Sequence, residues 1–195
     1  MILKNRYWAL RHGISIANER GLIVSSPEEG VPGFGLSPAG RAELGQALRP
    51  ERIRASGLEI KNAICYSSDF RRAIETARIF CELNGLQEPL TDFRLRERYF
   101  GKFDGQSHEL YEIVWQRDRE HPDRPHRTVE STAAVADRLH AFIQECEQKH
   151  EKADVVAVSH GDPLQILQAV LTGLAPDRHR TLPPLANGEL RLLLA

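Results

Sequence analysis

Two histidines stand at the ends of apolar runs, and each is followed by a glycine. The run from Tyr7 to Leu10 leads into Arg11, His12 and Gly13, and the run from Val155 to Val158 leads into Ser159, His160 and Gly161. A neutral imidazole can attack an electrophilic phosphorus, and an arginine offers planar, permanently charged donors that match phosphoryl oxygens. The glycine after each histidine allows a sharp turn and a close approach of the backbone to a ligand. The pattern predicts phosphate chemistry at the carboxyl ends of two strands.

The tripeptide from Arg11 to Gly13 is weak evidence by itself. A solvated turn explains such a short motif equally well, and His12 can also be a core histidine that bonds to the backbone. Residues elsewhere in the chain that could complete a phosphate site are needed to distinguish these interpretations.

Arg72 is the first such partner. It follows a strand-like stretch from Ala63 to Tyr66 and lies near the start of an expected helix for which a serine of the Ser67-Ser68 pair can serve as the cap. The apolar stripe of that helix comprises Phe70, Ala73, Ile74, Ala77 and Phe80, and Arg72 lies off it. We expect the guanidinium of Arg72 to point toward the carboxyl edge of the sheet. The alternative is an ion pair with Glu75 or Glu82 on the helix surface.

Glu97 is the candidate acid and base. Phosphoryl transfer to a histidine needs a proton for the leaving alkoxide, and hydrolysis of the phosphohistidine needs a proton removed from water, so one carboxyl group can serve both steps. We expect burial and a dianionic substrate to raise the pKa of Glu97, with Arg98 opposing them. The alternative is that Glu97 only bridges Arg96 or Arg98.

These motifs together resemble the histidine phosphatase superfamily, within it the branch of cofactor-dependent phosphoglycerate mutase and fructose-2,6-bisphosphatase. They follow in family order, as Arg11-His12-Gly13 with Asn18, Leu36 to Gly40, Ser68 to Ala77, Glu97 to Gly101, Glu130-Ser131 with Arg138, and Ser159-His160-Gly161. The resemblance implies that His12 is the phosphorylated nucleophile and Glu97 the proton donor. It implies a phosphate pocket of Arg11, Arg72 and His160, with Asn18 as a further contact, and we add Arg98 and Gly161 as substrate-binding residues.

Two aspartates compete with Glu97, because the acid phosphatases of the superfamily carry an aspartate directly after the second histidine. Here that position is Gly161, and Asp162 comes one residue later, before Pro163. We interpret Asp162 as a helix cap and Asp104, which lies between glycines, as a turn residue. Glu130 and Arg138 are interpreted as a cap and an ion pair of the following helix rather than as substrate contacts.

Composition limits the possible partners. The 195 residues carry a net charge of -1 and have 41% hydrophobic residues, which indicates one domain over residues 1–195 and no nucleic-acid or anionic-membrane partner. Three cysteines without metal-ligand spacing, Cys65, Cys81 and Cys146, suggest reduced thiols in a cytoplasmic protein. We expect no signal peptide and no transmembrane segment. We also expect no metal and no cofactor, since the arginines and a protonated His160 supply the positive charge that phosphoryl transfer needs. The sequence does not indicate an oligomeric state.

The predicted fold is an α/β three-layer α/β/α sandwich with a mostly parallel sheet, phosphoglycerate mutase-like. Strand-like runs lie near residues 6–11, 62–66, 154–159 and 189–194, and the resemblance adds a possible antiparallel edge strand. Two segments, residues 21–35 and 117–127, have an irregular pattern. The second is a candidate lid over the pocket, and a solvated loop is the alternative.

Hydrolysis is the predicted reaction. Mutases of the resembled branch carry extra basic sequence between the segments that correspond to Glu97 and Glu130, whereas this interval is short here and lacks a cluster of basic residues like theirs. A less completely closed pocket admits water to a phosphohistidine, which favours a phosphomonoesterase acting on a small phosphorylated metabolite and releasing inorganic phosphate. A mutase-type phosphotransferase and a non-catalytic phospholigand-binding protein are the alternatives.

Overall fold

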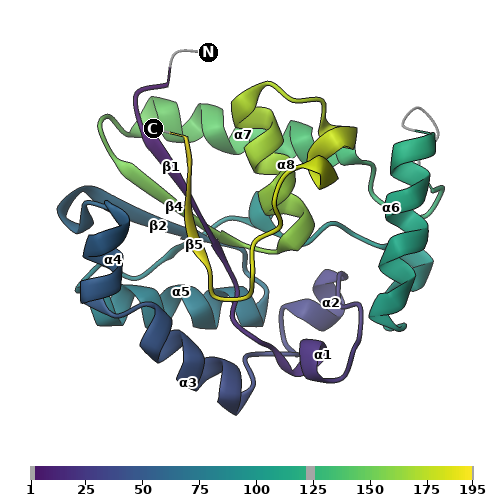
Figure 1. Cartoon of the computed structure of the whole chain (residues 1–195), viewed down its shortest axis with the longest axis horizontal. Helices are drawn as coiled ribbons and strands as arrows, with labels where there is room; N and C mark the ends of the chain where they lie inside the picture. The colour runs from purple at the N-terminus through teal and green to yellow at the C-terminus, as the bar shows by residue number, and fades with distance from the viewer. Residues whose placement is uncertain (1–2, 122–125, 195) are drawn as a thin grey trace.

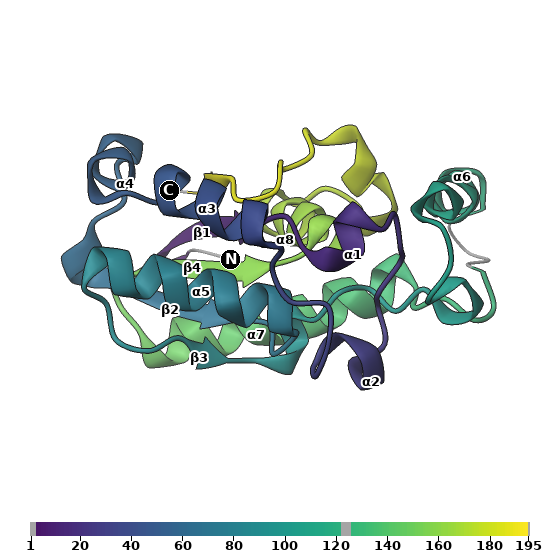
Figure 2. The ribbon, with the colours of Figure 1, turned by 90° about the horizontal axis from the view of Figure 1, so that it is seen from below.

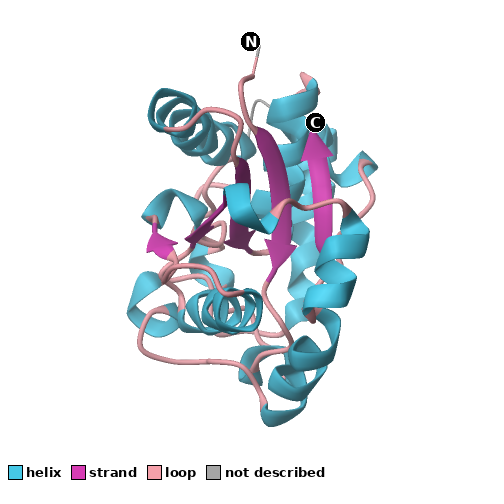
Figure 3. Ribbon diagram, turned by 90° about the vertical axis from the view of Figure 1, so that its left-hand side faces the viewer, coloured by secondary structure: helices cyan, strands magenta, loops and turns pink. Residues whose placement is uncertain are grey.

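The computed structural model describes residues 3–121 and 126–194 and contains a five-stranded sheet (Figures 1 and 3). The strands lie in the order β3-β2-β4-β1-β5. Pairing is parallel throughout except for β5, which runs antiparallel to β1 at the edge of the sheet. The predicted mostly parallel sheet and the antiparallel edge strand are therefore confirmed. The strands are β1 (Arg6–Arg11), β2 (Ala63–Ser67), β3 (Leu90–Thr91), β4 (Asp154–Ser159) and β5 (Leu190–Leu194).

Helices cover both faces of the sheet, because the central strands are apolar on both sides. Along β1, Tyr7 and Ala9 pack against α7 (Thr132–Lys149) and α8 (Gly161–Thr172). Trp8 and Leu10 face the opposite layer, which is made by α3 (Pro38–Ala47), α4 (Pro50–Ser56) and α5 (Arg71–Asn84). Figure 1 shows the two layers on either side of the strands, so the three-layer sandwich is confirmed.

The register of the parallel strands aligns their carboxyl ends. Arg11 of β1 lies opposite Ser159 of β4, and Ser67 of β2 lies opposite Val158. The residues that follow each strand, among them His12 and His160, therefore leave the sheet at one edge. This edge is where an open α/β sheet forms its ligand site.

Shorter elements and one longer helix lie beyond this edge. The helix α6 (Tyr111–Glu120) stands at the side of the molecule, away from the sheet (Figure 2). Of the two segments predicted to be irregular, residues 117–127 are therefore helical up to Glu120. Residues 122–125 of this candidate lid lie outside the described residues. The other elements are α1 (Ile16–Glu19), α2 (Pro27–Gly30) and the 3-10 helices η1 (Ile60–Asn62), η2 (Phe93–Leu95), η3 (Gly101–Phe103), η4 (His108–Leu110) and η5 (Pro176–Thr181).

The predicted caps of α5 and α8 are wrong. The residue before α5 is Phe70, without a side-chain cap, and Ser68 instead accepts the Phe70 N–H at 3.2 Å in the preceding turn. The helix α8 begins at Gly161 with His160 before it, so Asp162 lies inside the first turn. Both side chains have buried partners described below, and these outweigh the local preference for capping.

Candidate active site

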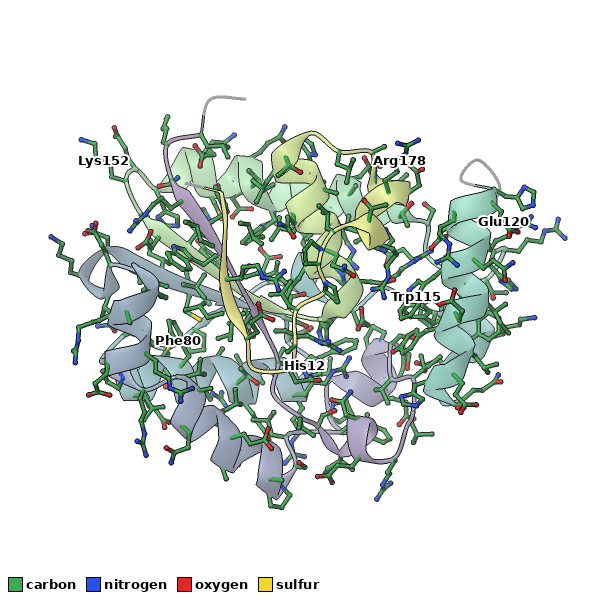
Figure 4. All side chains as sticks on the ribbon, in the orientation of Figure 1. His12, Phe80, Trp115, Glu120, Lys152 and Arg178 are labelled. Carbon is green, nitrogen blue, oxygen red and sulfur yellow. The ribbon has the colours of Figure 1, made fainter. Side chains whose placement is uncertain are left out.

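A cavity of about 230 Å³ opens at the carboxyl edge of the sheet. His12, which is labelled in Figure 4, lies in its wall. Six of the eight predicted site residues line it: Arg11, His12, Asn18, Arg72, Glu97 and Gly161. His160 lies behind this wall, and Arg98 belongs to the surrounding framework. Segments that are far apart in the sequence thus supply one site.

His12 is held as a neutral ring with its reactive nitrogen toward the cavity. Its Nδ1 lies 2.8 Å from the carbonyl oxygen of Gly13, which can only accept, so Nδ1 carries the proton and Nε2 the lone pair. Burial lowers the pKa of His12 well below its ordinary value, and the charges of Arg72 and Arg11 add to this. The hydrogen bond to the backbone that was expected of a core histidine is therefore present. The same bond leaves Nε2 unprotonated, which a nucleophile requires.

Arg11 and Arg72 each bring a guanidinium with a donor that has no partner. Arg11 donates to the Leu185 carbonyl at 2.7 Å, and Arg72 donates to the Val24 carbonyl at 2.9 Å and to His12 Nε2 at 3.2 Å. Within the described residues, Arg11 Nε and Arg72 Nη1 are buried without a hydrogen bond. Buried donors are normally satisfied, so two such cationic groups at one cavity indicate an oxyanion site.

The surface pair considered for Arg72 does not form. Glu75 instead accepts from Arg71 at 3.0 Å and from Arg41 at 3.0 Å on the outer side of α5. Arg72 is 4% exposed and points from the first turn of α5 to the sheet edge, as predicted.

His160 packs against His12 and does not line the cavity. The two ring centroids are 5.1 Å apart, and His160 Nε2 lies 3.0 Å from Ser68 Oγ. Burial lowers the pKa of His160 well below its ordinary value, with Arg72 and His12 as further causes. The ring is therefore neutral rather than the protonated cation expected, because full burial beside Arg72 disfavours a further charge. Its Nδ1 has no hydrogen-bond partner among the described residues and lies 4.0 Å from Glu97 Oε2.

Gly161 and Asn18 contribute polar groups at two helix starts. Gly161 opens the twelve-residue helix α8, whose first N–H groups and dipole favour an anion, and its Cα faces the guanidinium of Arg11. Asn18 Oδ1 accepts the N–H of Ser15 at 3.0 Å, which closes a capping box on α1 and leaves the amide NH₂ at the cavity.

Glu97 is a buried carboxyl group in the cavity wall. Its Oε1 accepts the N–H of Arg98 at 2.9 Å. Burial, followed by the negative charge of Asp162, raises the pKa of Glu97 to about 7 against the opposing charges of Arg72 and Arg11. The raised pKa was expected, but the contribution of Asp162 was not. Arg96 pairs with Asp69 at 2.6 Å, so Glu97 does not bridge the neighbouring arginines.

Arg98 does not line the cavity, in contrast to the expectation of a substrate contact. Its guanidinium is fully buried and donates to both oxygens of Asp118, at 2.5 and 2.9 Å, and to the Glu130 carbonyl at 2.7 Å. These partners use the donors that a substrate would need. Arg138 pairs with Glu130 at 2.9 Å, as predicted, but the cap of α7 is Ser131 rather than Glu130. Both paired residues lie outside the cavity wall.

Asp162 is an ionised anchor rather than a competing acid. It accepts from Trp115 Nε1 at 3.1 Å and from Arg98 and Arg180, each at 3.4 Å. Burial alone would raise the pKa of Asp162, but His179, Arg98 and Arg180 lower it below the ordinary value. A carboxylate without a proton cannot protonate a leaving group, which leaves Glu97 as the candidate acid. Asp104 lies in a turn, as predicted, and also accepts the Ser25 N–H at 2.6 Å.

Comparison with known protein families agrees with this geometry. The family model "Histidine phosphatase superfamily (branch 1)" matches residues 7–194. The chain belongs to the histidine phosphatase superfamily.

Individual relatives span most of the chain. A putative phosphoserine phosphatase 2 of Hydrogenobacter thermophilus is 29% identical over 174 residues, 87% of this chain and 79% of the relative. A glucosyl-3-phosphoglycerate phosphatase of Mycolicibacterium vanbaalenii is 29% identical over 194 residues, 92% of this chain and 80% of the relative. A solved mycobacterial glucosyl-3-phosphoglycerate phosphatase in complex with VO3 has a TM-score of 0.77 and 26% identity, covering 95% of this chain and 90% of that chain. This histidine phosphatase is therefore a hydrolytic enzyme.

Sequence reasoning missed the far wall of the phosphatase cavity. Tyr111, Trp115, Gln165 and Arg180 line it, and the rings of Tyr111 and Trp115 stack with their centroids 5.2 Å apart. These residues come from α6, α8 and η5, and no strand end or local motif connects them. The only available signal was two aromatic residues four apart on a helix, a spacing that is also common in cores.

Gly13 has a different role from the one predicted. It does not line the cavity, and a Cβ at this position would lie 2.5 Å from Leu44 Cδ1. The glycine therefore allows the chain after β1 to cross closely over α3, which fixes the path of His12.

Proposed function

We propose that this phosphatase hydrolyses a small phosphorylated metabolite through a phosphohistidine on His12, with Glu97 as the proton donor. One observation carries the proposal. The unprotonated Nε2 of a neutral His12 accepts from Arg72 in the wall of a cavity that Arg11 also lines, and among the described residues each of these guanidiniums has one buried donor without a hydrogen-bond partner. Phosphoryl transfer requires a nucleophile and positively charged donors that contact the same tetrahedral phosphoryl group.

In the first step, His12 Nε2 attacks the phosphorus and the bond from phosphorus to the ester oxygen breaks. Glu97 donates its proton to the departing oxygen, so the alcohol leaves neutral. Arg11, Arg72 and the N–H of Gly161 stabilise the charge on the three equatorial oxygens. Arg72 has to release Nε2 before the attack, and the incoming phosphoryl oxygens replace that acceptor.

In the second step, water attacks the phosphohistidine. Glu97, now a carboxylate, takes a proton from the water, the bond from phosphorus to nitrogen breaks, and inorganic phosphate leaves. His12 and protonated Glu97 are regenerated. A pKa of about 7 suits a group that must give a proton in one step and take one in the next.

Hydrolysis is favoured over transfer by the limited basic character of the cavity. Among the described residues, its cationic lining consists of three arginines and contains no lysine. Some relatives have mutase names, such as phosphoglycerate mutase-like protein 4 of Arabidopsis thaliana, 33% identical over 136 residues. A mutase-type phosphotransferase activity is therefore the second candidate.

We propose no metal and no cofactor for the reaction, because two guanidiniums and a helix start already supply the charge stabilisation. The proposal treats residues 1–195 as a single catalytic domain of a cytoplasmic protein, to which the three free, buried cysteines are suited. No helix in the described part of the chain is both long and apolar enough to cross a membrane. Small phosphorylated molecules are the proposed partners, and nucleic acid is not.

The test compares the wild-type protein with His12→Ala on p-nitrophenyl phosphate. We expect the wild type to release phosphate and to form an acid-labile, base-stable phosphoenzyme, and the variant to lose both. His140→Ala, on an exposed position of α7, is the control and should retain both. A phosphoenzyme that persists in His12→Ala excludes the mechanism. Turnover that requires an added bisphosphate supports the mutase, and tight phosphate binding without turnover supports a non-catalytic phospholigand-binding protein.

A further inference from the structure

A third guanidinium, that of Arg180 in η5, lines the same cavity and has no part in the phosphoryl chemistry above. Its carbon Cζ lies 3.7 Å from the ring centroid of Trp115. Figure 4 shows Trp115 on the side of α6 that faces the body of the molecule and His12. The arginine thus belongs to the wall that faces the phosphoryl clamp.

Arg180 is held in a fixed orientation. Its Nη1 donates to Gln165 Oε1 at 2.5 Å and, at 3.4 Å, to Asp162. Gln165 is itself fixed, because its amide donates to the Leu182 carbonyl at 2.7 Å. Stacking on one side and hydrogen bonds along one edge restrict the rotamers of Arg180 before any ligand arrives, which lowers the entropic cost of binding.

The outer edge of this guanidinium is available to a ligand. The side chain is 23% exposed, and among the described residues its Nε and Nη2 have no hydrogen-bond partner. Asp162 does not fully neutralise it, because the same carboxylate also accepts from Trp115 and Arg98 and its contact with Arg180 is long. Nε and Nη2 together form the fork that binds a carboxylate or phosphate with two parallel hydrogen bonds.

Two residues of α8 lie next to the two cationic groups and give a guide to their separation. Gly161, which faces Arg11, and Gln165, which holds Arg180, are four residues apart, about 6 Å along a helix. A phosphoryl group and a second anionic group on a chain of about three carbons span such a distance. The cavity of about 230 Å³ also suits a molecule of that size.

We propose that Arg180 is a specificity-determining residue that binds a second oxyanion of the substrate, a carboxylate or a second phosphate, about three carbons from the phosphoryl group. The proposal rests on the proposed function and adds a substrate class to it. The preferred substrates are phosphomonoesters of small acids or small bisphosphates, rather than phosphorylated alcohols or sugars without another charge.

The test measures kcat/KM for matched substrates. For the carboxylate, 3-phosphoglycerate is compared with glycerol 3-phosphate, and for the second phosphate, fructose 1,6-bisphosphate is compared with fructose 6-phosphate. We expect the wild type to prefer the more anionic member of one pair by about 10- to 100-fold, the range for a charge-assisted hydrogen bond. Whichever pair shows the preference identifies the oxyanion.

In Arg180→Gln that preference should fall to about twofold or less, chiefly through a higher KM for the anionic substrate. Arg180→Lys, which keeps the charge without the planar fork, should retain only part of it. Arg178→Gln is the matched control, because Arg178 is an exposed arginine of the same 3-10 helix outside the cavity wall and should keep the full preference.

Failure of this proposal is distinguishable from failure of the proposed function. A wild type that forms phosphohistidine and hydrolyses p-nitrophenyl phosphate but shows neither preference overturns the role of Arg180 alone. A preference that persists in both Arg180 variants does the same. Absence of turnover and of phosphohistidine in the wild type overturns the proposed function itself.

Discussion

At the residue scale, burial shifts the protonation of the site's side chains toward their uncharged forms. Burial keeps His12 and His160 uncharged, and it keeps Glu97 protonated up to a pH of about 7. The positive charge available to a phosphoryl group therefore comes from Arg11 and Arg72 rather than from the histidines. A neutral histidine next to two guanidiniums has the lone pair that nucleophilic attack requires.

The protonation of Glu97 leads to a prediction about pH. Because the first step needs the acid form, kcat/KM for an alkyl phosphate should fall as pH rises through about 7, approaching tenfold per pH unit above it. Glu97→Gln should remove this alkaline limb and lower the rate by about 10²–10⁴-fold with an alkyl phosphate. With p-nitrophenyl phosphate, whose leaving group needs no proton, the loss should be much smaller. Initial rates of both proteins from pH 5 to about 9 give the comparison.

An equal loss on the aryl and alkyl substrates would contradict the role of Glu97 as a proton donor. It would indicate instead that the carboxyl group positions its neighbours, for instance through the N–H of Arg98.

At the scale of elements, the sequence predicts the near side of the site and not the far side. Apolar runs that end in histidine and glycine identify β1 and β4, and parallel pairing then places His12 and His160 at one edge. The far wall depends on how α6 and η5 pack around α8, and Trp115, Asp162 and Arg180 meet there only in three dimensions. Local capping rules misassigned Asp162, because its buried ion pairs hold it inside the first turn of α8 and outweigh the preference of a short polar side chain for the N-cap position.

The segment that carries Glu97 gives a prediction about backbone conformation. Gly101 has φ of +56°, and a Cβ there would lie 1.9 Å from the carbonyl oxygen of Thr128. Gly105 has φ of +76° in open space. Gly105→Ala should therefore cost only the strain of a left-handed residue, about 1–2 kcal/mol. Gly101→Ala adds a backbone clash and should cost more than about 3 kcal/mol.

Urea unfolding of the two glycine variants measures these costs directly. Gly101→Ala should also lower activity, because either Thr128 or the chain that follows Glu97 must move. Equal stabilities for the two variants would show that the contact between Gly101 and Thr128 does not constrain this segment.

At the scale of the whole molecule, the protein has a net charge of -1 but concentrates buried positive charge at one edge of the sheet. Within the described part of the chain, one donor each of Arg11 and Arg72 is buried without a hydrogen-bond partner, which lowers the stability of the fold because burial removes water from these donors. An anion that restores those bonds binds the folded state and not the unfolded chain. Folding stability is thereby linked to phosphate.

Inorganic phosphate should accordingly raise the melting temperature. At a phosphate concentration 100 times Kd, the linkage adds about 2.7 kcal/mol, which corresponds to about 5–10 °C for a chain of this size. Arg72→Met should lose the shift, because Arg72 provides one of the unpaired donors. Arg71→Met, one residue away on the exposed side of α5 and paired with Glu75, should keep it. Melting curves at equal ionic strength separate the specific effect from screening, and the same shift in both variants would place the bound phosphate outside the cavity.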